Sequence, residues 1–304
     1  MQSSPTSASS TSASSTSASS GSASAGSAAA LPAANARLHM PEFTLGERFT
    51  AEQREFLDTY GFIRFPGFAD AATVRGLCAD QEEVDKKLLA EGRTQIYGVP
   101  FIRGTRGDGT QYIQRMPFSS LFGPRLHAFL QDPRFGAILE VAGEGFRIGE
   151  EERDGLVINH FRREAGSRYK RLGWHTDSLR DVFYFERPRK YLNVGFYLDD
   201  SPIAKGGVRL LPGTHNQSVW KMLTRKVHFL QYEPDPDEYA IEARAGDHTI
   251  HDGRIWHRVA TATATGEASQ RRVMYLPLMN GPLKKKNERS KTPFYFHLKK
   301  LIGG

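Results

Sequence analysis

The stretch Trp174–Ser178 carries a histidine and a carboxylate two residues apart, His175 and Asp177. Side chains alternate along an extended segment, so both groups project from the same side of a strand. Two histidines and one carboxylate form the ligand set of mononuclear non-haem Fe(II) and leave positions open for a cosubstrate and O2. A structural hydrogen-bonded pair is the alternative for His-x-Asp alone, so the metal site requires a third ligand and a suitable scaffold.

The third ligand is expected between Gly246 and His257, where the chain carries His248, His251 and His257. His257 follows a Gly-Arg turn and an apolar pair, so it re-enters a strand, where its placement is rigid. His251 lies at the end of the preceding strand and is the alternative that spacing leaves open, whereas His248 is predicted to be structural or exposed. The two facing sheets of an antiparallel sandwich can bring this stretch opposite Trp174–Ser178.

A 2-oxoglutarate cosubstrate would chelate the metal at one end, and its far carboxylate would need a cation, best supplied by an arginine. Arg271 and Arg272 begin the strand after the last of these histidines. Consecutive strand residues face opposite ways, so only one of the two can point inward, and spacing does not choose between them. On an earlier strand, Asn159 or His160 is expected to face the cosubstrate, with a satisfied core residue as the alternative. Trp174 is also predicted to contact the cosubstrate.

The elements that must position these groups are short strands in the second half of the chain. Apolar runs separated by turn signals predict strands at 156–161, 191–198, 208–211, 249–250 and 273–276. Helices are predicted at Thr50–Tyr60, from Asp70 to about Gly92, and in two pieces between Pro124 and Gly143, with a loop over Gly98–Met116. This order predicts a mainly β fold with flanking helices and a double-stranded β-helix core, a cupin-like jelly roll.

The N-terminal segment has a different composition from the rest of the chain. Met1–Ala30 is almost entirely Ser, Ala, Thr and Gly, without a charged or aromatic residue, so residues 1–37 are predicted to be a disordered tail. Residues 38–304 are predicted to form a single domain. Within that domain we expect N-terminal helices over 50–145, the jelly-roll core over 146–280 and a basic C-terminal tail over 281–304.

The net charge and the cysteine content indicate the charge of the ligands and the cellular compartment to expect. The formal net charge is +7, which favours anions in general. Cys78 is the single cysteine, which excludes an intrachain disulfide and fits a reducing cytoplasm. The N-terminal segment has no long apolar run, so it is neither a secretory signal nor a membrane span. Its Ser/Ala richness leaves organelle import as the alternative location, although no Arg or Lys precedes Arg37.

Basic residues crowd both sides of Trp174–Ser178 and suggest the class of partner. Arg162, Arg168 and Arg180 are predicted to form a cationic rim that recruits a small anionic substrate, with a solvated basic loop as the alternative. The C-terminal tail also mixes basic and aromatic residues, a composition that can bind nucleic acid. A solvated tail is the commoner arrangement, so we expect no nucleic acid and no membrane partner. The chain is expected to be a monomer or a homodimer.

From Tyr60 to Leu278 the sequence resembles the phytanoyl-CoA dioxygenase (PhyH) family of Fe(II)/2-oxoglutarate-dependent oxygenases. The motifs that carry the resemblance are Tyr60-Gly61-Phe62 with Pro66-Gly67-Phe68, Trp174–Ser178, Leu198–Asp200 with Gly206–His215, and Gly246-Asp247 with Gly253-Arg254 and His257. The resemblance implies that His175, Asp177 and His257 hold the metal and favours Arg271 as the cosubstrate anchor. Arg258-Val259 stands where family members often have a Gly-Ser pair, so the hydroxyl contact to the cosubstrate carboxylate is lost or replaced here.

The resemblance implies an enzyme that uses Fe(II), 2-oxoglutarate and O2 and releases succinate and CO2. Because Asp177 would occupy an iron position that a halide would need, hydroxylation is favoured over halogenation. The expected substrate is a small, anionic metabolite, or an acyl-CoA or natural-product intermediate. Desaturation or epoxidation at the same centre is the alternative reaction. A non-catalytic jelly-roll module that binds through its basic tail is the alternative from a different functional class.

Overall fold

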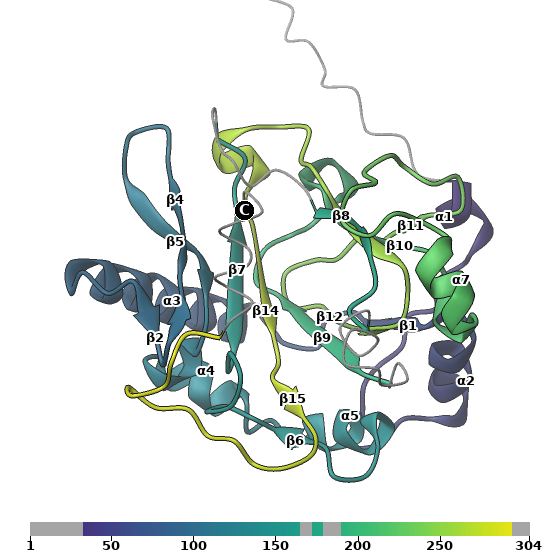
Figure 1. The fold of residues 1–304 in the computed structure, drawn as a ribbon, viewed down its shortest axis with the longest axis horizontal. Coiled ribbons are helices and arrows are strands. Elements are labelled where there is room, and N and C mark those ends of the chain that lie inside the picture. The colour runs from purple at the N-terminus through teal and green to yellow at the C-terminus, as the bar shows by residue number, and fades with distance from the viewer. Residues whose placement is uncertain (1–32, 165–171, 179–189, 294–304) are drawn as a thin grey trace, which may run out of the picture.

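Two antiparallel sheets with helices around them make up the computed structural model, which describes residues 33–164, 172–178 and 190–293 (Figure 1). The larger sheet of the described chain consists, in spatial order, of β1 (Phe62–Phe65), β12 (His248–Asp252), β9 (Leu192–Tyr197), β14 (Arg271–Tyr275), β7 (Val157–Phe161), β5 (Gln111–Met116) and β4 (Ile102–Thr105). The smaller sheet consists of β11 (Tyr239–Ala240), β10 (Gly207–Leu210), β13 (His257–Ala260) and β8 (Leu172–His175). The prediction of a mainly β fold is confirmed.

The two sheets face each other across a shared interior. The ring of Phe62 on β1 lies 5.0 Å from that of Tyr239 on β11, and the rings of His251 on β12 and His257 on β13 are 5.1 Å apart. Two-stranded ladders add β6 (Arg147–Ile148) with β15 (Leu278–Met279), and β2 (Gln95–Ile96) with β3 (Val99–Pro100). Face-to-face packing of this kind is the arrangement that the jelly-roll prediction requires.

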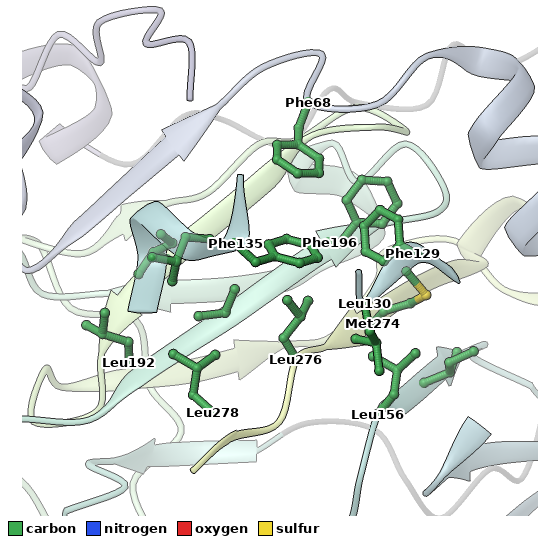
Figure 2. Close-up of a cluster of buried hydrophobic side chains, with 14 of the residues drawn as sticks. Phe68, Phe129, Leu130, Phe135, Leu156, Leu192, Phe196, Met274, Leu276 and Leu278 are labelled. Atoms are coloured by element: carbon green, nitrogen blue, oxygen red, sulfur yellow. The ribbon is translucent and has the colours of Figure 1, made fainter. Parts of the chain in front are cut away.

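The outer face of the larger sheet forms the main hydrophobic core with the helices. Figure 2 shows Phe196 and Met274 of the sheet packed with Phe129 and Phe135 from the helical side. Phe196 and Met274 are opposite each other in the β9–β14 ladder, and both are fully buried. Apolar side chains therefore occupy one face of this sheet, and the other face is left for the interior between the sheets.

The predicted helices are confirmed. They are α2 (Ala51–Tyr60), α3 (Ala71–Ala90), α4 (Pro124–Phe129) and α5 (Phe135–Ala142). Thr50 caps α2, since its hydroxyl accepts from the Gln53 N–H while the Gln53 side chain accepts from the Thr50 N–H. Asp70 caps α3 by accepting from the Thr73 N–H at 2.7 Å. Cys78 on α3 is half-buried against the main core, an ordinary position for a free cysteine.

Two details of the N-terminal half correct the sequence-based expectations. Gly98–Met116 is not a loop, because β4 and β5 form a hairpin in it that joins the larger sheet through β7. Residues 33–37 are not part of a disordered tail, because they form the helix α1 (Ala33–Arg37), in which Asn35 exchanges hydrogen bonds with the backbone of Ala240. Strands of the region 50–145 therefore contribute to the larger sheet as well.

Asp85 on α3 lies among charged residues of the helix, but it is buried, and its carboxylate accepts from the Ile113 N–H at 2.8 Å. Burial raises the pKa of Asp85 to about 6, against the lowering effects of that hydrogen bond and of Arg106. A carboxylate therefore joins α3 to β5 where an apolar contact would be usual.

After β15, the described part of the C-terminal segment turns back past β6 toward β2 (Figure 1). Glu152 and Lys285 form an antiparallel bridge, and the ammonium of Lys285 contacts the carboxylate of Glu151 at 2.5 Å. The positive charge of this part of the tail is therefore partly compensated. Among the helices of the described residues, none combines the length and apolarity needed to cross a membrane.

Gly61 provides a test of how α2 is joined to β1. It ends α2 with a φ of +79°, and a Cβ at this position would lie 2.4 Å from Nδ1 of His215, whose Nε2 bonds the Asp58 carbonyl at 3.0 Å. Gly67 has a similar φ of +60° but an open surrounding, with nothing within 4 Å of a Cβ.

We expect Gly67→Ala to lower the free energy of unfolding by about 1–2 kcal/mol, the cost of a left-handed non-glycine residue. Gly61→Ala should cost a further ~1–3 kcal/mol because the methyl group would displace the His215 ring. Chemical denaturation of both variants measures the difference. Equal losses would show that the contact with His215 does not constrain this turn.

Candidate metal centre

The site is built on one cross-strand pair. His175 on β8 and His257 on β13 are directly opposite each other in the antiparallel ladder, and their rings are 4.1 Å apart. His175 ends β8 and His257 begins β13, and both side chains are more than nine-tenths buried. The pairing in the smaller sheet therefore sets the separation of the two imidazoles.

Asp177 completes a group of three ligand-type side chains with these histidines. Its carboxylate oxygens lie 3.7 Å from Nε2 of His175 and 3.7 Å from Nε2 of His257. One potential ligand atom from each residue falls within 4.8 Å of the others, in the only such group among the described residues. Asp177 was expected on the strand, but β8 ends at His175 and Asp177 lies in the turn that follows. The turn nevertheless directs its carboxylate toward both imidazoles.

The donor set fits a divalent metal of the Fe(II) type. Nδ1 of His175 bonds the Gly173 carbonyl at 2.9 Å, and Nδ1 of His257 bonds the Ile255 carbonyl at 3.1 Å. A carbonyl only accepts, so each Nδ1 carries the proton and each Nε2 keeps a free lone pair directed toward Asp177. Burial, followed by the neighbouring His257, lowers the pKa of His175 to about 3, so this imidazole is neutral and able to bind a metal.

Asn193 on β9 holds the carboxylate of Asp177 in place. Its side-chain N–H donates to Oδ2 of Asp177, so the larger sheet contacts the ligand group directly. Burial raises the pKa of Asp177, but His257, His175, His251 and this hydrogen bond together hold it below the ordinary value. The Asp177 side chain is 36% exposed, so it is accessible to a ligand.

The ladders of the larger sheet settle which arginine faces the interior. Gly195 of β9 and Tyr275 of β14 are opposite each other and share one face of the sheet. Gly195 is two residues after Asn193, and Tyr275 is two residues after Val273, so Asn193 and Val273 lie on that face as well. The face that carries Asn193 therefore also carries Tyr275, Val273 and Arg271. Arg271 is buried, its guanidinium lies 3.9 Å from the ring centre of Phe161, and its Nε–H donates to the Lys205 carbonyl.

Arg272 lies on the opposite face of β14 and binds α3. Its guanidinium donates to both carboxylate oxygens of Asp199, at 2.9 and 2.8 Å, and to Gln81 and Glu82 at 3.1 Å each. Burial lowers the pKa of Arg272, but the contacts with Asp199 raise it more, so the group stays charged. Of the two candidates, Arg272 is therefore the one that does not fit a cosubstrate contact, because its guanidinium binds groups outside the interior.

Asn159 and His160, like the two arginines, point to opposite faces of the larger sheet. Asn159 is opposite Val273 and so faces the interior, whereas His160 is opposite Arg272 and its ring lies 4.8 Å from that of Tyr112. Burial lowers the pKa of His160 to about 4. Of the two alternatives, the position of Asn159 is the one compatible with a cosubstrate contact.

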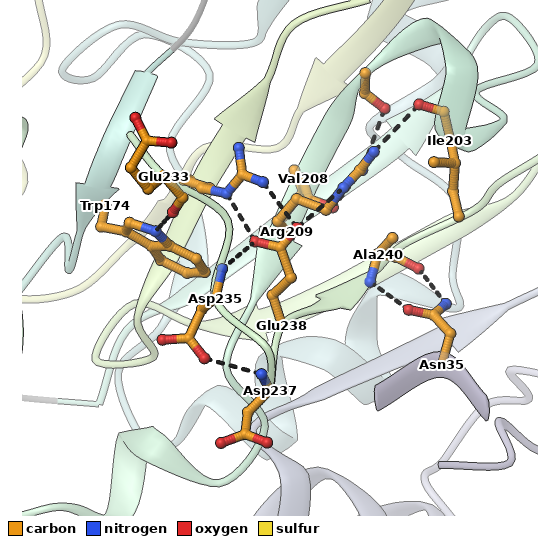
Figure 3. Close-up of polar contacts among 12 residues, drawn as sticks. Asn35, Trp174, Ile203, Val208, Arg209, Glu233, Asp235, Asp237, Glu238 and Ala240 are labelled. Atoms are coloured by element: carbon orange, nitrogen blue, oxygen red, sulfur yellow. Dashed lines mark hydrogen bonds and ion pairs between the residues drawn. The ribbon is translucent and has the colours of Figure 1, made fainter. Parts of the chain in front are cut away.

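Trp174 is a further correction. It lies between Gly173 and His175 on β8 and therefore points away from the metal ligands, and its indole N–H donates to the Glu233 carbonyl at 2.9 Å. Figure 3 shows this contact within a polar layer that covers the outside of the smaller sheet, with Glu238 and Arg209 beside it. In the same layer Arg258 donates to both oxygens of Glu238, at 2.8 and 2.7 Å. Trp174 thus supports β8 from outside and does not line the cosubstrate space.

Phe229 is a residue of the site that the sequence did not reveal. Its N–H donates to the Trp174 carbonyl and the Trp174 N–H donates to the Gln231 carbonyl, both at 2.8 Å, so this segment pairs with β8. The Phe229 ring stacks on His175 at 4.9 Å and remains 44% exposed. Its φ of +63° is unusual for a residue with a Cβ, and no sequence pattern marks such a conformation.

The predicted cationic rim is only partly within the described chain. Arg162 donates to the carboxylate of Glu164 and is not an uncompensated cation. Arg168 and Arg180 lie outside the described residues. The one rim residue that can be placed therefore does not support the rim, whose other members stay a prediction.

A family model described as phytanoyl-CoA dioxygenase (PhyH) matches residues 57–272. A curated relative, the probable alpha-ketoglutarate-dependent hypophosphite dioxygenase of Stutzerimonas stutzeri, is 24% identical over 173 residues, 57% of this chain and 55% of that protein. The chain thus matches just over half the length of this relative.

Solved structures share the fold at low identity. HygX from Streptomyces hygroscopicus, solved with nickel and 2-oxoglutarate bound, has a TM-score of 0.54 at 16% identity and matches over 78% of this chain and 89% of its own. The alpha-ketoglutarate-dependent epimerase SnoN from nogalamycin biosynthesis has a TM-score of 0.52 at 20% identity over 75% and 81%. EctD from S. alaskensis has a TM-score of 0.55 at 16% identity over 84% and 86%.

We expect Asn193→Ala to weaken divalent-metal binding by about 10- to 100-fold, the usual effect of losing a hydrogen bond to a ligating carboxylate. Calorimetric titration with Fe(II) under anaerobic conditions, or with Co(II), measures the metal affinity of the variant and of the wild type. Asn35→Ala is the matched control, because that asparagine bonds only the Ala240 backbone and should leave metal affinity unchanged. Equal affinity of the Asn193 variant and the wild type would exclude Asn193 from orienting a metal ligand.

Proposed function

The chain belongs to the phytanoyl-CoA dioxygenase family, and from this premise we propose that it is an Fe(II)- and 2-oxoglutarate-dependent oxygenase that hydroxylates a small, anionic molecule. The observation that carries the proposal is the group formed by His175, Asp177 and His257, with Arg271 on the same interior. Two neutral imidazoles and one carboxylate are the ligands that non-haem Fe(II) uses. The family match and the geometry of the chain thus support the same chemistry.

The residues divide the work of binding the metal and the cosubstrate. His175, Asp177 and His257 would hold the iron, which when bound supplies the activation of O2 coupled to decarboxylation of 2-oxoglutarate to succinate and CO2. Arg271 would pair with the far carboxylate of 2-oxoglutarate, since a planar guanidinium matches a carboxylate. Asn159, on the same face, would add a hydrogen bond to the cosubstrate. The burial of the imidazoles and of Arg271 keeps bulk water away from these contacts.

Two observations support an anionic substrate. Arg115 on β5 is opposite Asn159 and so faces the interior; its Nη2 pairs with Asp154 at 2.7 Å, but its Nη1 is buried without a hydrogen-bond partner among the described residues. That N–H needs an acceptor, which a carboxylate or phosphorus oxyanion would provide. The relative from Stutzerimonas stutzeri is named for hypophosphite, itself a small oxyanion.

Hydroxylation is the outcome that a three-ligand site with a retained carboxylate favours. Asp177 takes the position that a bound halide would need, which argues against halogenation. The alternatives are desaturation or epoxidation at the same centre, and the neighbours of this fold include proteins named as an epimerase and a carbocyclase. A non-catalytic binding module is a weaker alternative, because all three potential ligand residues are present and their ligand atoms lie close together.

The two adjacent arginines give a matched test of cosubstrate binding. Arg271→Leu should raise the Kd for 2-oxoglutarate by about 10- to 100-fold, the usual effect of losing a charge-assisted pair. Arg272→Leu should lower stability but leave that Kd unchanged, because its partners are Asp199 and α3. The charge-transfer absorption of the anaerobic Fe(II)–2-oxoglutarate complex reports the Kd. If the two variants bound 2-oxoglutarate equally well, Arg271 would not be the anchor.

Turnover on a panel of compounds tests the reaction and the substrate class. Succinate release should be stimulated by acidic compounds, including hypophosphite, phosphonates and carboxylates, together with a product that gains one oxygen atom from 18O2. His175→Ala should abolish both signals, whereas His248→Phe, altered on the opposite face of the sheet, should retain them. Stimulation only by neutral or cationic compounds would contradict the anionic substrate. Absence of 2-oxoglutarate-dependent succinate with every compound would leave the oxygenase proposal without support.

A further inference from the structure

The imidazole of His251 lies deep between the two sheets, next to the three potential ligands but outside their group. It is 5% exposed, and its ring is 5.1 Å from that of His257. On the adjacent strand it is opposite Asn193, the residue that holds Asp177. His251 thus belongs to the ring of residues around the site, although its nitrogens are not among the atoms that converge within 4.8 Å.

Nε2 of His251 is shielded from solvent and has no hydrogen-bond partner among the described residues. A buried polar atom left unpaired costs about 1–3 kcal/mol, so such atoms in native proteins nearly always have a partner, whether protein, water or ligand. Within the described chain, the groups that surround this nitrogen are those that would bind a metal and a cosubstrate. The hydrogen-bond partner of Nε2 is therefore expected to be a molecule bound at the site.

His248, three residues earlier on the same strand, shows the contrasting case. It lies on the opposite face of β12, where its ring packs near Phe65, Phe68 and Phe135 at 6.3, 5.1 and 6.0 Å. Its ring nitrogens also have no hydrogen-bond partner among the described residues, but the groups around them are aromatic core side chains and not the residues of the site. His251, in contrast, is next to Asn193, His257 and Asp177, all of them polar groups directed into the interior.

The position of His251 relative to Arg271 indicates which part of a bound molecule it would meet. His251 lies on β12 and Arg271 on β14, with β9 between them. If Arg271 takes the far carboxylate of 2-oxoglutarate, the oxo-acid end lies at the three ligand atoms, next to His251. A neutral imidazole offers one N–H donor and one acceptor, so Nε2 of His251 can donate to an oxygen of that end.

We propose that His251 positions the cosubstrate by donating a hydrogen bond from Nε2 to the oxo-acid end of 2-oxoglutarate, an inference that rests on the proposed oxygenase function. In this role His251 is neither a metal ligand nor a part of the apolar core. It fixes the orientation of the chelating end, while Arg271 fixes the far end. The two residues together would hold the cosubstrate at both ends from two different strands of the larger sheet.

The test compares three variants by anaerobic titration of the Fe(II) protein with 2-oxoglutarate. His251→Phe, which removes the donor, should raise the Kd about 10-fold or more and shift the charge-transfer band, since a hydrogen bond to the chelate alters its electronic state. His251→Gln, whose amide N–H reaches a position similar to that of Nε2, should recover most of the affinity. His248→Phe is the matched control and should keep both the Kd and the band of the wild type. Co(II) titration without 2-oxoglutarate should give the same metal affinity for all the proteins.

Each outcome separates the proposal from its alternatives. An unchanged Kd and band in His251→Phe would overturn it, because the residue would then not contact the cosubstrate. Loss of Co(II) binding in both His251 variants would also overturn it and would make His251 a metal ligand. Failure of Gln to recover affinity would overturn the hydrogen bond in favour of a role in shape alone. Absence of the band in the wild-type protein would instead contradict the proposed function itself.

Discussion

The candidate centre depends on one antiparallel pairing, that of His175 on β8 with His257 on β13. The ladder alone brings two imidazoles to 4.1 Å, and the turn after β8 then brings Asp177 to both of them. β8 is short and lies at the edge of the smaller sheet of the described chain, so this pairing needs support from outside. The pairing of Phe229 and Gln231 with Trp174, and the hydrogen bond of the Trp174 indole, provide it. The outer layer of the smaller sheet is thus part of the site's construction, although it contributes no ligand.

The alternation of side chains across the larger sheet explains how one sheet serves two purposes. His251, Asn159 and Arg271 face the polar interior, whereas their neighbours His248, His160 and Arg272 face the helices. The helical side buries Phe196 and Met274 in the main core and provides the stability of the fold. The interior can therefore keep polar groups whose hydrogen bonds are completed only by ligands.

Much of the fold could be predicted from local signals in the sequence. Capping residues such as Thr50 and Asp70 marked the helices, because a side-chain acceptor for the first turn is a local requirement. The spacing of His175 and Asp177 indicated the metal centre, but it left His257 and His251 as alternatives for the third ligand. Which of them approaches the pair is set by the register between strands, and that register depends on contacts between distant residues.

The expectations that were wrong depended on tertiary partners. The hairpin of β4 and β5 has no regular apolar pattern, because one of its strands lies at the sheet edge with exposed side chains. Arg162 was expected in a cationic rim, but its charge is compensated by Glu164, and Asp85 is held by the backbone of the distant Ile113. A residue's type shows the charge of its side chain but not the group that it contacts, so neither pairing could be predicted from the sequence.

The opposite orientations of Arg271 and Arg272 have a consequence for how the strand finds its place during folding. A slip of β14 by one residue would turn Arg271 toward α3 and Arg272 into the interior, with no change in composition or charge. The two side chains are chemically identical, so they cannot select the correct register by themselves. The rest of the strand selects it, because the same slip would turn Met274 out of the main core, where it lies opposite Phe196. Once the register is set, Asp199 and Glu82 bind the arginine on the helical side, and Arg271 faces the interior.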